Sequence, residues 1–169
     1  GDMRDKIRSF ADLASGNAEL PGPTGEANTL KLRGRGVALC LGGALGGASD
    51  SALQALLAIA AGNIAVCAKS TDAETLRKAL AAAGAPDDLL MVRDSIGRSA
   101  FLHDAVRLIV YDGGAGGRSA IENILTDREG AIIPIVSTND EVWRFCAERT
   151  LTINTTAAGG DVRLLSLSE

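Results

Sequence analysis

The stretch GVALCLGGALGGASDSALQALLAIAAGNIAVCA, residues 36–68, decides the fold. It opens with an apolar run, GVALCL, of the kind that forms a fully buried strand of a parallel sheet. The glycines within 42–47 predict a turn, after which Asp50 can cap a helix. Apolar residues of that helix recur at i, i+3, i+4 and i+7, and Gly62 follows as a C-terminal glycine. Residues 64–68 then form a second apolar run, so the order is strand, helix, strand.

The same alternation continues along the chain. Pro134 lies inside the last apolar run and restricts that strand to an edge or a bulge. Thr71 and Glu74 match a capping box at the start of a helix. Alternating elements of this length predict an α/β fold, namely a Rossmann-like parallel sheet with helices on both faces, followed by a C-terminal strand and tail. The further elements expected are strands at 89–92, 106–111 and 131–136 and helices at 72–83 and 118–126.

The two ends of the chain have a different pattern. Residues 4–14 predict an amphipathic helix, and LPGPTGEAN at 20–28 is rich in Pro and Gly, which indicates an extended linker. We therefore divide the chain into an N-terminal helix and linker, a Rossmann-like domain, and a C-terminal strand with an interaction tail. The expected bounds of these parts are 1–35, 36–149 and 150–169.

Composition and charge exclude several classes of function. The net charge is −4, and KLRGR at 31–35 is too short for a nucleic-acid footprint, so no nucleic-acid partner is expected through this region. The sequence contains neither an apolar stretch of about 18 residues nor a signal-peptide pattern. We therefore expect a soluble protein in the cytoplasm. The three cysteines are widely spaced, which argues against a zinc site, and no metal is expected. Cys40 and Cys67 lie inside apolar runs and predict buried thiols.

Two glycine loops follow strands and precede helices, where Rossmann proteins bind phosphates. The loop at 42–47 lacks both the G-x-G-x-x-G pattern and the lysine of a P-loop. In the second loop Gly114, Gly116 and Ser119 give G-x-G-x-x-S. Tight turns between strand and helix explain both loops, and we favour that interpretation. Nucleotide binding stays the alternative, with these weak candidates for contact: Gly113, Gly114, Gly116 and Arg118.

Catalytic patterns are weak. His103 is the single histidine and lies beside Asp104, just before the strand expected at 106–111. Neighbouring His and Asp residues rarely form a catalytic dyad, since adjacent side chains point apart on a strand, so a solvated or strand-capping histidine is favoured. Trp143 with Phe145 indicates a core or interface anchor. An independent enzyme that uses Cys146 or His103 is a third interpretation, for which a thiol of lowered pKa would be needed. We therefore expect no catalytic residue in this chain.

Four stretches stand in order along the chain and carry a resemblance. They are LPGPTGEANTL at 20–30, GVALCL at 36–41, the pair Gly62-Asn63, and ERT at 148–150 leading into NTTAAGG at 154–160. Together they resemble the C-terminal region of the proline utilization A family, over about residues 4–169. Members of that family are bacterial flavoenzymes that carry proline dehydrogenase and glutamate-semialdehyde (pyrroline-5-carboxylate) dehydrogenase on one polypeptide. The long members have a C-terminal domain similar to the NAD-binding fold of aldehyde dehydrogenases.

This chain departs from the aldehyde dehydrogenase pattern at the residues that carry chemistry. Glycines at 42–47 stand where that superfamily has Asn-x-Pro, and Ala68 stands where it has the lysine that contacts the adenosine ribose. Lys69 is displaced by one residue, which turns it to the other face of the strand. The Phe-Thr-Gly-Ser turn falls on residues 111–114, where a single glycine matches. The catalytic domain, with its nucleophilic Cys and general-base Glu, is absent from this sequence.

The resemblance implies a non-catalytic domain of a polypeptide that oxidises proline to glutamate, with FAD for the first step and NAD for the second. The fragment itself is expected to bind no cofactor. The family implies that it packs on the dehydrogenase module and helps to close the internal substrate passage. A homodimer is left open, and so is peripheral attachment of the cytoplasmic parent to a membrane.

The C-terminal stretch TINTTAAGG is our candidate for an interaction element. Leu151 and Ile153 alternate with Thr152 and Asn154, as in a strand that can pair with a sheet edge. The small residues that follow let another backbone approach closely. We expect the edge to belong to the dehydrogenase module or to a second copy. The tail comprises Ile153, Asn154, Thr155, Thr156, Ala157, Ala158, Gly159 and Gly160.

Overall fold

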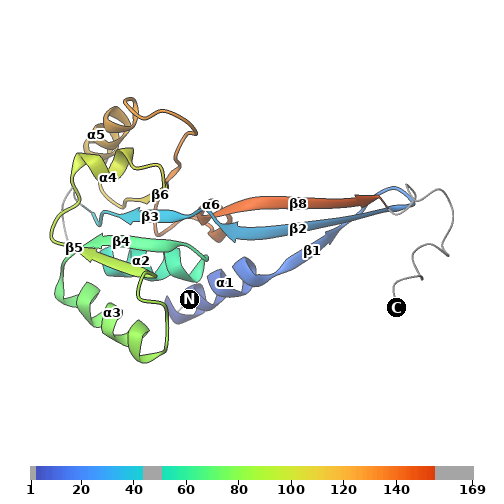
Figure 1. The fold of residues 1–169 in the computed structure, drawn as a ribbon, viewed down its shortest axis with the longest axis horizontal. Coiled ribbons are helices and arrows are strands. Elements are labelled where there is room, and N and C mark those ends of the chain that lie inside the picture. Colours follow the sequence, from blue (N-terminus) through green and yellow to red (C-terminus); the bar gives the residue numbers. More distant parts are fainter. Residues whose placement is uncertain (1–2, 44–50, 155–169) are drawn as a thin grey trace.

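A five-stranded parallel sheet forms the centre of the molecule. The computed structural model describes residues 3–43 and 51–154. The strand order is β5-β4-β3-β6-β7, with every neighbouring pair parallel, so the chain runs outward from β3 to β5 and then crosses to β6 and β7 (Figure 1). The strands span Val37–Cys40 (β3), Ile64–Ala68 (β4), Leu90–Arg93 (β5), Val106–Val110 (β6) and Ile135–Val136 (β7).

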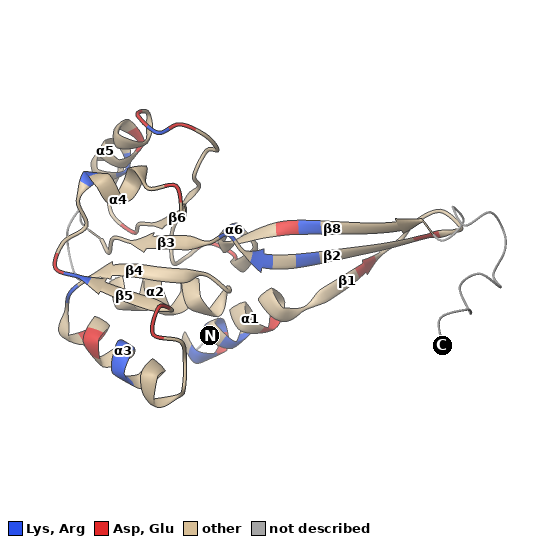
Figure 2. Ribbon diagram, in the orientation of Figure 1, with Lys and Arg blue, Asp and Glu red and all other residues tan. Residues whose placement is uncertain are grey.

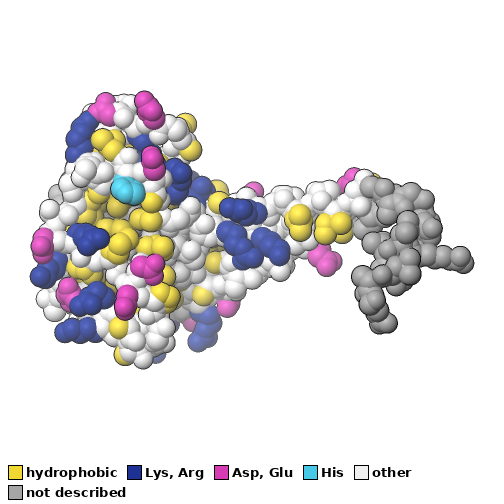
Figure 3. All heavy atoms as spheres, in the orientation of Figure 1, with side chains coloured by type: hydrophobic (Ala, Val, Ile, Leu, Met, Phe, Trp, Pro, Cys, Tyr) yellow, Lys and Arg dark blue, Asp and Glu magenta, His cyan; other side chains and the backbone are white. Residues whose placement is uncertain are grey.

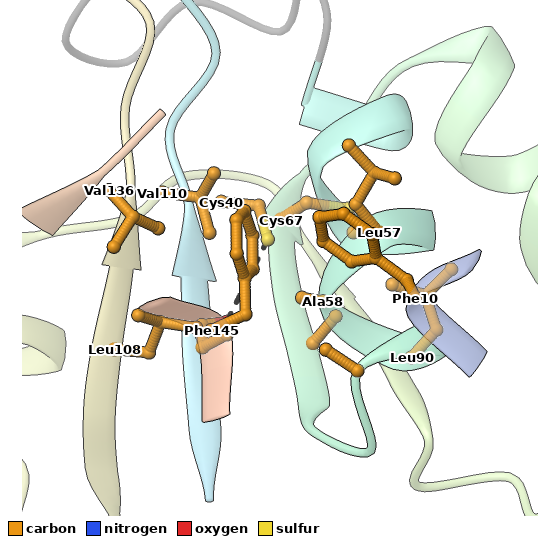
Figure 4. Close-up of a cluster of buried hydrophobic side chains, with 14 of the residues drawn as sticks. Phe10, Cys40, Leu57, Ala58, Cys67, Leu90, Leu108, Val110, Val136 and Phe145 are labelled. Carbon is orange, nitrogen blue, oxygen red and sulfur yellow. Dashed lines mark hydrogen bonds between the residues drawn. The ribbon is translucent and has the colours of Figure 1, made fainter. Parts of the chain in front are cut away.

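Helices cover both faces of this sheet, which confirms the predicted Rossmann-like fold. One hydrophobic cluster joins α1, α2, α3 and α6 to one face, and a second cluster joins α4 and α5 to the other. In the first cluster the rings of Phe10 and Phe145 meet edge to face, with their centroids 5.1 Å apart (Figure 4). The helices span Met3–Ser15 (α1), Ser51–Ala60 (α2), Thr71–Ala82 (α3), Arg98–Leu102 (α4), Ala115–Leu125 (α5) and Val142–Phe145 (α6). Among the described helices, none is long and apolar enough to cross a membrane.

The structure confirms that β7 is an edge strand, but it places the N-cap of α3 one residue earlier than predicted. β7 is an edge strand, as predicted from Pro134, but it spans only Ile135–Val136 rather than 131–136, and Pro134 lies just before it. The cap of α3 is Ser70 rather than Thr71, because the Ser70 hydroxyl accepts a hydrogen bond from the N–H of Ala73 at 3.1 Å. The predicted capping box of Thr71 and Glu74 is therefore wrong, since the residue three after the cap is Ala73, which has no side-chain acceptor. The capping role expected of Asp50 lies outside the described residues.

The ends of the chain combine into a second sheet, which we call the arm. The arm consists of β1 (Asn17–Leu20), β2 (Glu26–Gly34) and β8 (Cys146–Asn154), paired antiparallel in the order β1-β2-β8. It projects from the body of the molecule (Figure 1). The extended linker expected at 20–28 is replaced here by the end of β1, a turn and the start of β2. Sequence reasoning missed β1 and β2, because most of their side chains are exposed or half-buried and leave a weak apolar pattern.

The arm and the body are joined at the buried side chain of Asn63. Its Oδ1 accepts hydrogen bonds from the N–H groups of Arg35 and Gly36, at 2.7 and 3.3 Å. Its Nδ2 donates to the carbonyls of Ala58 and Phe145, both at 3.1 Å. One amide therefore binds the end of α2, the link from β2 to β3, and the last residue of α6.

Two glycines allow this junction to close. A Cβ at Gly34 would lie 1.9 Å from the carbonyl oxygen of Gly62, which is backbone and cannot move aside. Gly62 itself has φ of +84°, a left-handed conformation that side chains oppose. Glycine is needed at both positions, the first for close approach and the second for its backbone angle.

Replacing Asn63 by Ala should lower the free energy of unfolding by about 2–4 kcal/mol, because buried donors and acceptors lose their partners. Asn63→Asp should cost at least as much, since a carboxylate keeps the acceptor side but sets an oxygen against two carbonyls. Urea unfolding followed by circular dichroism measures both. The exposed Asn123→Ala on α5 is the matched control and should change stability by less than about 0.5 kcal/mol. A loss below that value for Asn63→Ala would contradict the role of this junction.

Candidate functional site

The point where the strand order reverses lies between the carboxyl ends of β3 and β6, and it is where open α/β sheets bind ligands. Asp112 follows β6 at this point. Its Oδ2 accepts a hydrogen bond from Gln54 of α2 at 2.6 Å, and its Oδ1 accepts from the Ser137 hydroxyl at 2.6 Å and the Thr138 N–H at 2.7 Å. Gln54 is fully buried and also bonds both backbone groups of Gly42. One carboxylate thus ties together the loops after β3, β6 and β7.

The hydrogen bonds keep Asp112 ionised. Burial acts to raise the pKa of Asp112, but the bonds from Gln54, Ser137 and Thr138 outweigh it and bring the pKa below its ordinary value. The crevice therefore contains a fixed negative charge. Such a charge opposes a pyrophosphate, which Rossmann proteins bind at this place through backbone N–H groups.

In the candidate glycine loop, two glycines pack against the side chain of Tyr111 and two have open space beside them. Cβ atoms added at Gly113 and Gly117 would lie 2.1 and 1.8 Å from the hydroxyl of Tyr111, so the phenol ring packs against these two residues. At Gly114 and Gly116 nothing lies within 4 Å of an added Cβ. Gly114 caps the N-terminus of α5 without a side-chain hydrogen bond. The structure therefore leaves part of the predicted loop accessible.

The other candidates for nucleotide contact are only partly placed. The guanidinium of Arg118 pairs with Glu122 one turn along α5, Nε to Oε1 at 3.1 Å, instead of reaching over the loop. Of the first glycine loop, Gly42 and Gly43 are described, and Gly42 has φ of +71°. The rest of that loop lies outside the described residues.

The candidate nucleophiles are buried. Cys40, Cys67 and Cys146 are all free and buried, as predicted for the first two. Burial raises the pKa of all three thiols, and that of Cys67 reaches about 11. The thiolate is the reactive form, so burial disfavours that form near neutral pH. His103 is exposed, and its Nδ1 accepts a hydrogen bond from the N–H of Ala105 at 3.1 Å. This is the backbone-capping role expected for it.

The aromatic pair expected as an anchor is split. Phe145 is fully buried in the core, where it meets Phe10, whereas 53% of the Trp143 side chain is exposed. Phe145 is thus a core residue. Trp143 lies on the surface beside Arg144, whose guanidinium carbon is 5.9 Å from the ring centroid.

Strand β8 contains the described part of the predicted interaction tail. Ile153 and Asn154 end this strand and pair in register with Ala27 and Glu26 of β2. We expected β8 to pair with a sheet edge of another module or of a second copy. On one side, its partner is instead β2 of the same chain. Its other side borders no further strand among the described residues. The tail residues Thr155, Thr156, Ala157, Ala158, Gly159 and Gly160 lie outside the described residues.

Comparison with known structures defines the class of the fold. An NAD-dependent benzaldehyde dehydrogenase from Corynebacterium glutamicum superposes on 80% of this chain with a TM-score of 0.61 at 16% identity, using 31% of its own length. The chain therefore has an aldehyde dehydrogenase-type α/β fold. Proline utilization A (PutA) from Bradyrhizobium japonicum, in a D779W mutant structure, superposes on 76% of the chain with a TM-score of 0.62 at 26% identity. That match uses 14% of the PutA chain.

Sequence comparison then identifies the relatives. The chain is homologous to bifunctional protein PutA, at 32% identity for Salmonella typhimurium and 28% for Escherichia coli, in both cases over 98% of its length. It spans 12% of the length of either relative. No family model matches the chain. The resemblance stated from the sequence is thereby confirmed.

Replacing Asp112 by Asn should lower the free energy of unfolding at pH 7 by about 1–3 kcal/mol, because an amide cannot accept all three hydrogen bonds. The folded-state pKa of Asp112 is depressed, so its contribution is complete above the unfolded pKa near 4 and is lost as pH falls through the folded pKa. The difference between wild type and variant should therefore shrink at pH 3. Urea unfolding at both pH values measures it. The exposed Asp94→Asn is the control, and a difference that did not depend on pH would contradict this assignment.

Proposed function

We propose that this chain is a non-catalytic domain of a bifunctional enzyme that oxidises proline to glutamate through pyrroline-5-carboxylate and glutamate semialdehyde. In the parent, FAD serves the first step and NAD the second, and the protein acts in the cytoplasm. The domain packs on the dehydrogenase module and helps to close the internal substrate passage. Homology to PutA over nearly the whole chain supports this assignment, and so do the buried thiols of raised pKa.

The observation that carries the proposal is the surface of the arm. Leu151 and Ile153 of β8 are 53% and 52% exposed, although large aliphatic side chains at the end of a sheet strand normally pack against a neighbour. Because side chains two apart share a face, Arg149 lies on the same face as these two. Lys31 of β2 lies directly opposite Arg149, which sets two like charges side by side.

This arrangement fits a partner with both apolar and acidic side chains. Figure 2 shows the basic positions of β2 and β8 near the body of the molecule, and Figure 3 shows hydrophobic side chains farther out on the arm. A carboxylate over Lys31 and Arg149 would relieve their repulsion, while Leu151 and Ile153 would be buried. The open edge of β8 adds backbone groups that a further strand can pair with. The proposed partner is the dehydrogenase module of the same polypeptide; a second copy of the chain is the other candidate.

The double replacement Leu151→Asp and Ile153→Asp in the full-length parent should disrupt this contact. We expect unchanged proline dehydrogenase activity, at least a threefold lower dehydrogenase activity, and a lag before NADH appears from proline. The reason is that burying two carboxylates in an apolar contact is unfavourable. Stopped-flow and steady-state assays of the coupled reaction measure these effects.

Ile132→Asp is the matched control for this experiment, because Ile132 is 98% exposed and lies outside the arm. It should behave as wild type. Unfolding of the 169-residue chain with the double replacement should be unchanged, since both residues are already exposed there. Normal coupling and normal dehydrogenase activity in the double variant would refute the proposed role.

A nucleotide-binding module is the alternative, favoured by one observation, the open N-terminus of α5 at Gly114 and Gly116. The charge of Asp112 and the ring of Tyr111 at the same edge oppose it. Isothermal titration of the chain with NAD separates the two functions. We expect no micromolar binding. A dissociation constant in that range, lost when Gly116 is replaced by Glu, would establish the alternative instead.

A further inference from the structure

One face of the parallel sheet is only partly covered by helices. Helices α1, α2 and α3 pack on the opposite face, whereas α4 has five residues and contacts β6 and α5. Over β3, β4 and β5 this leaves a cavity of about 380 Å3, whose apolar lining includes Leu39, Val66 and Met91. Figure 3 shows hydrophobic side chains gathered in this hollow, with the histidine at its edge. Cavities of this size with mainly apolar walls are the kind that hold small molecules.

Three polar side chains line the same cavity: Arg93, Ser95 and His103. Since Nδ1 of His103 accepts a hydrogen bond from Ala105, the neutral ring carries its proton on Nε2 and offers a donor there. The guanidinium of Arg93 contacts the sulfur of Met91 at 3.8 Å. In the described part of the chain it forms no ion pair with a carboxylate. The cavity thus combines an apolar interior with a cation and hydrogen-bond donors.

The wall that carries His103 is held in place by one arginine. Arg128 donates through Nη1 to the carbonyls of Phe101 and His103, at 3.1 and 2.7 Å. Through Nη2 it donates to the carbonyls of Asp104 and Val106, at 3.3 and 3.1 Å. These four bonds fix the segment between α4 and β6. A ligand would therefore meet a wall that is already ordered, which lowers the entropic cost of binding.

We propose that this cavity binds a small molecule that has an apolar ring or branched chain and one carboxylate. The apolar part lies on Leu39, Val66 and Met91, and the carboxylate pairs with the guanidinium of Arg93, which favours planar anions of this kind. A second anionic group would lack a partner, since Arg93 is the only cation of permanent charge among the lining residues. This inference is independent of the arm and its proposed partner.

Two probes that differ only in charge test the proposal on the 169-residue chain. 3-Phenylpropionate should cause saturable NMR shifts at the methyl groups of Met91 and Ala100, both of which line the cavity. The neutral amide, 3-phenylpropanamide, should bind about tenfold more weakly, because a hydrogen-bonded charge pair is replaced by a neutral contact. Equal affinity for the two probes, or shifts that do not saturate, would overturn the proposal.

Variants locate the site. Arg93→Gln should weaken 3-phenylpropionate binding about tenfold and leave the amide unchanged. Arg8→Gln makes the same chemical change at an exposed position on α1 and should have no effect. Ala100→Phe fills the cavity and should abolish binding of both probes. Equal binding by wild type and Arg93→Gln would refute the assignment, and so would self-association of the chain that competes with the probe in sedimentation experiments.

Discussion

The side-chain amide of Asn63 ties the antiparallel arm to the body of the molecule. Its four hydrogen bonds reach the end of α2, the two residues between β2 and β3, and the last residue of α6. An amide is suited to this place because it offers an acceptor and two donors in one plane. The absence of a side chain at Gly34 is equally necessary, since the backbone of Gly62 occupies that space. The junction is reinforced by α1, which packs on β2, and by Leu32 and Cys146 of the arm, which join the core cluster.

The sequence predicted the parallel sheet well because each central strand is a continuous apolar run. β3 and β6 are buried on both faces, so their hydrophobicity reports their position directly. The arm could not be found in the same way. β2 and β8 are half-buried or exposed along most of their length, and they come from opposite ends of the chain, so their pairing leaves no local signal. The pair Gly62-Asn63 contributes to the family resemblance, but its structural role depends on backbone groups of residues that only the fold brings near.

The switch point illustrates a similar limit. Asp112 lies on a turn that the aldehyde dehydrogenase superfamily fills with other residues, and no sequence pattern indicates a partner for its charge. The partners are Gln54 on α2 and Ser137 after β7, which meet Asp112 because parallel strands end at the same edge. By accepting these hydrogen bonds, the carboxylate of Asp112 holds the loops in place and gives this edge a negative charge. The same edge in a nucleotide-binding protein needs free N–H groups and positive potential, so the two uses of this position compete.

The arm sets the remaining constraint on function. A three-stranded sheet whose far end has exposed side chains buries little apolar area, and its strands depend on hydrogen bonds that water can reach. Unprotected edge strands also invite pairing with other chains. Lys31, Arg33 and Arg149 place positive charge on the arm, which discourages association with another basic edge while allowing an acidic one. A partner that covers Leu151 and Ile153 would therefore stabilise the arm and gain specificity from the same charges.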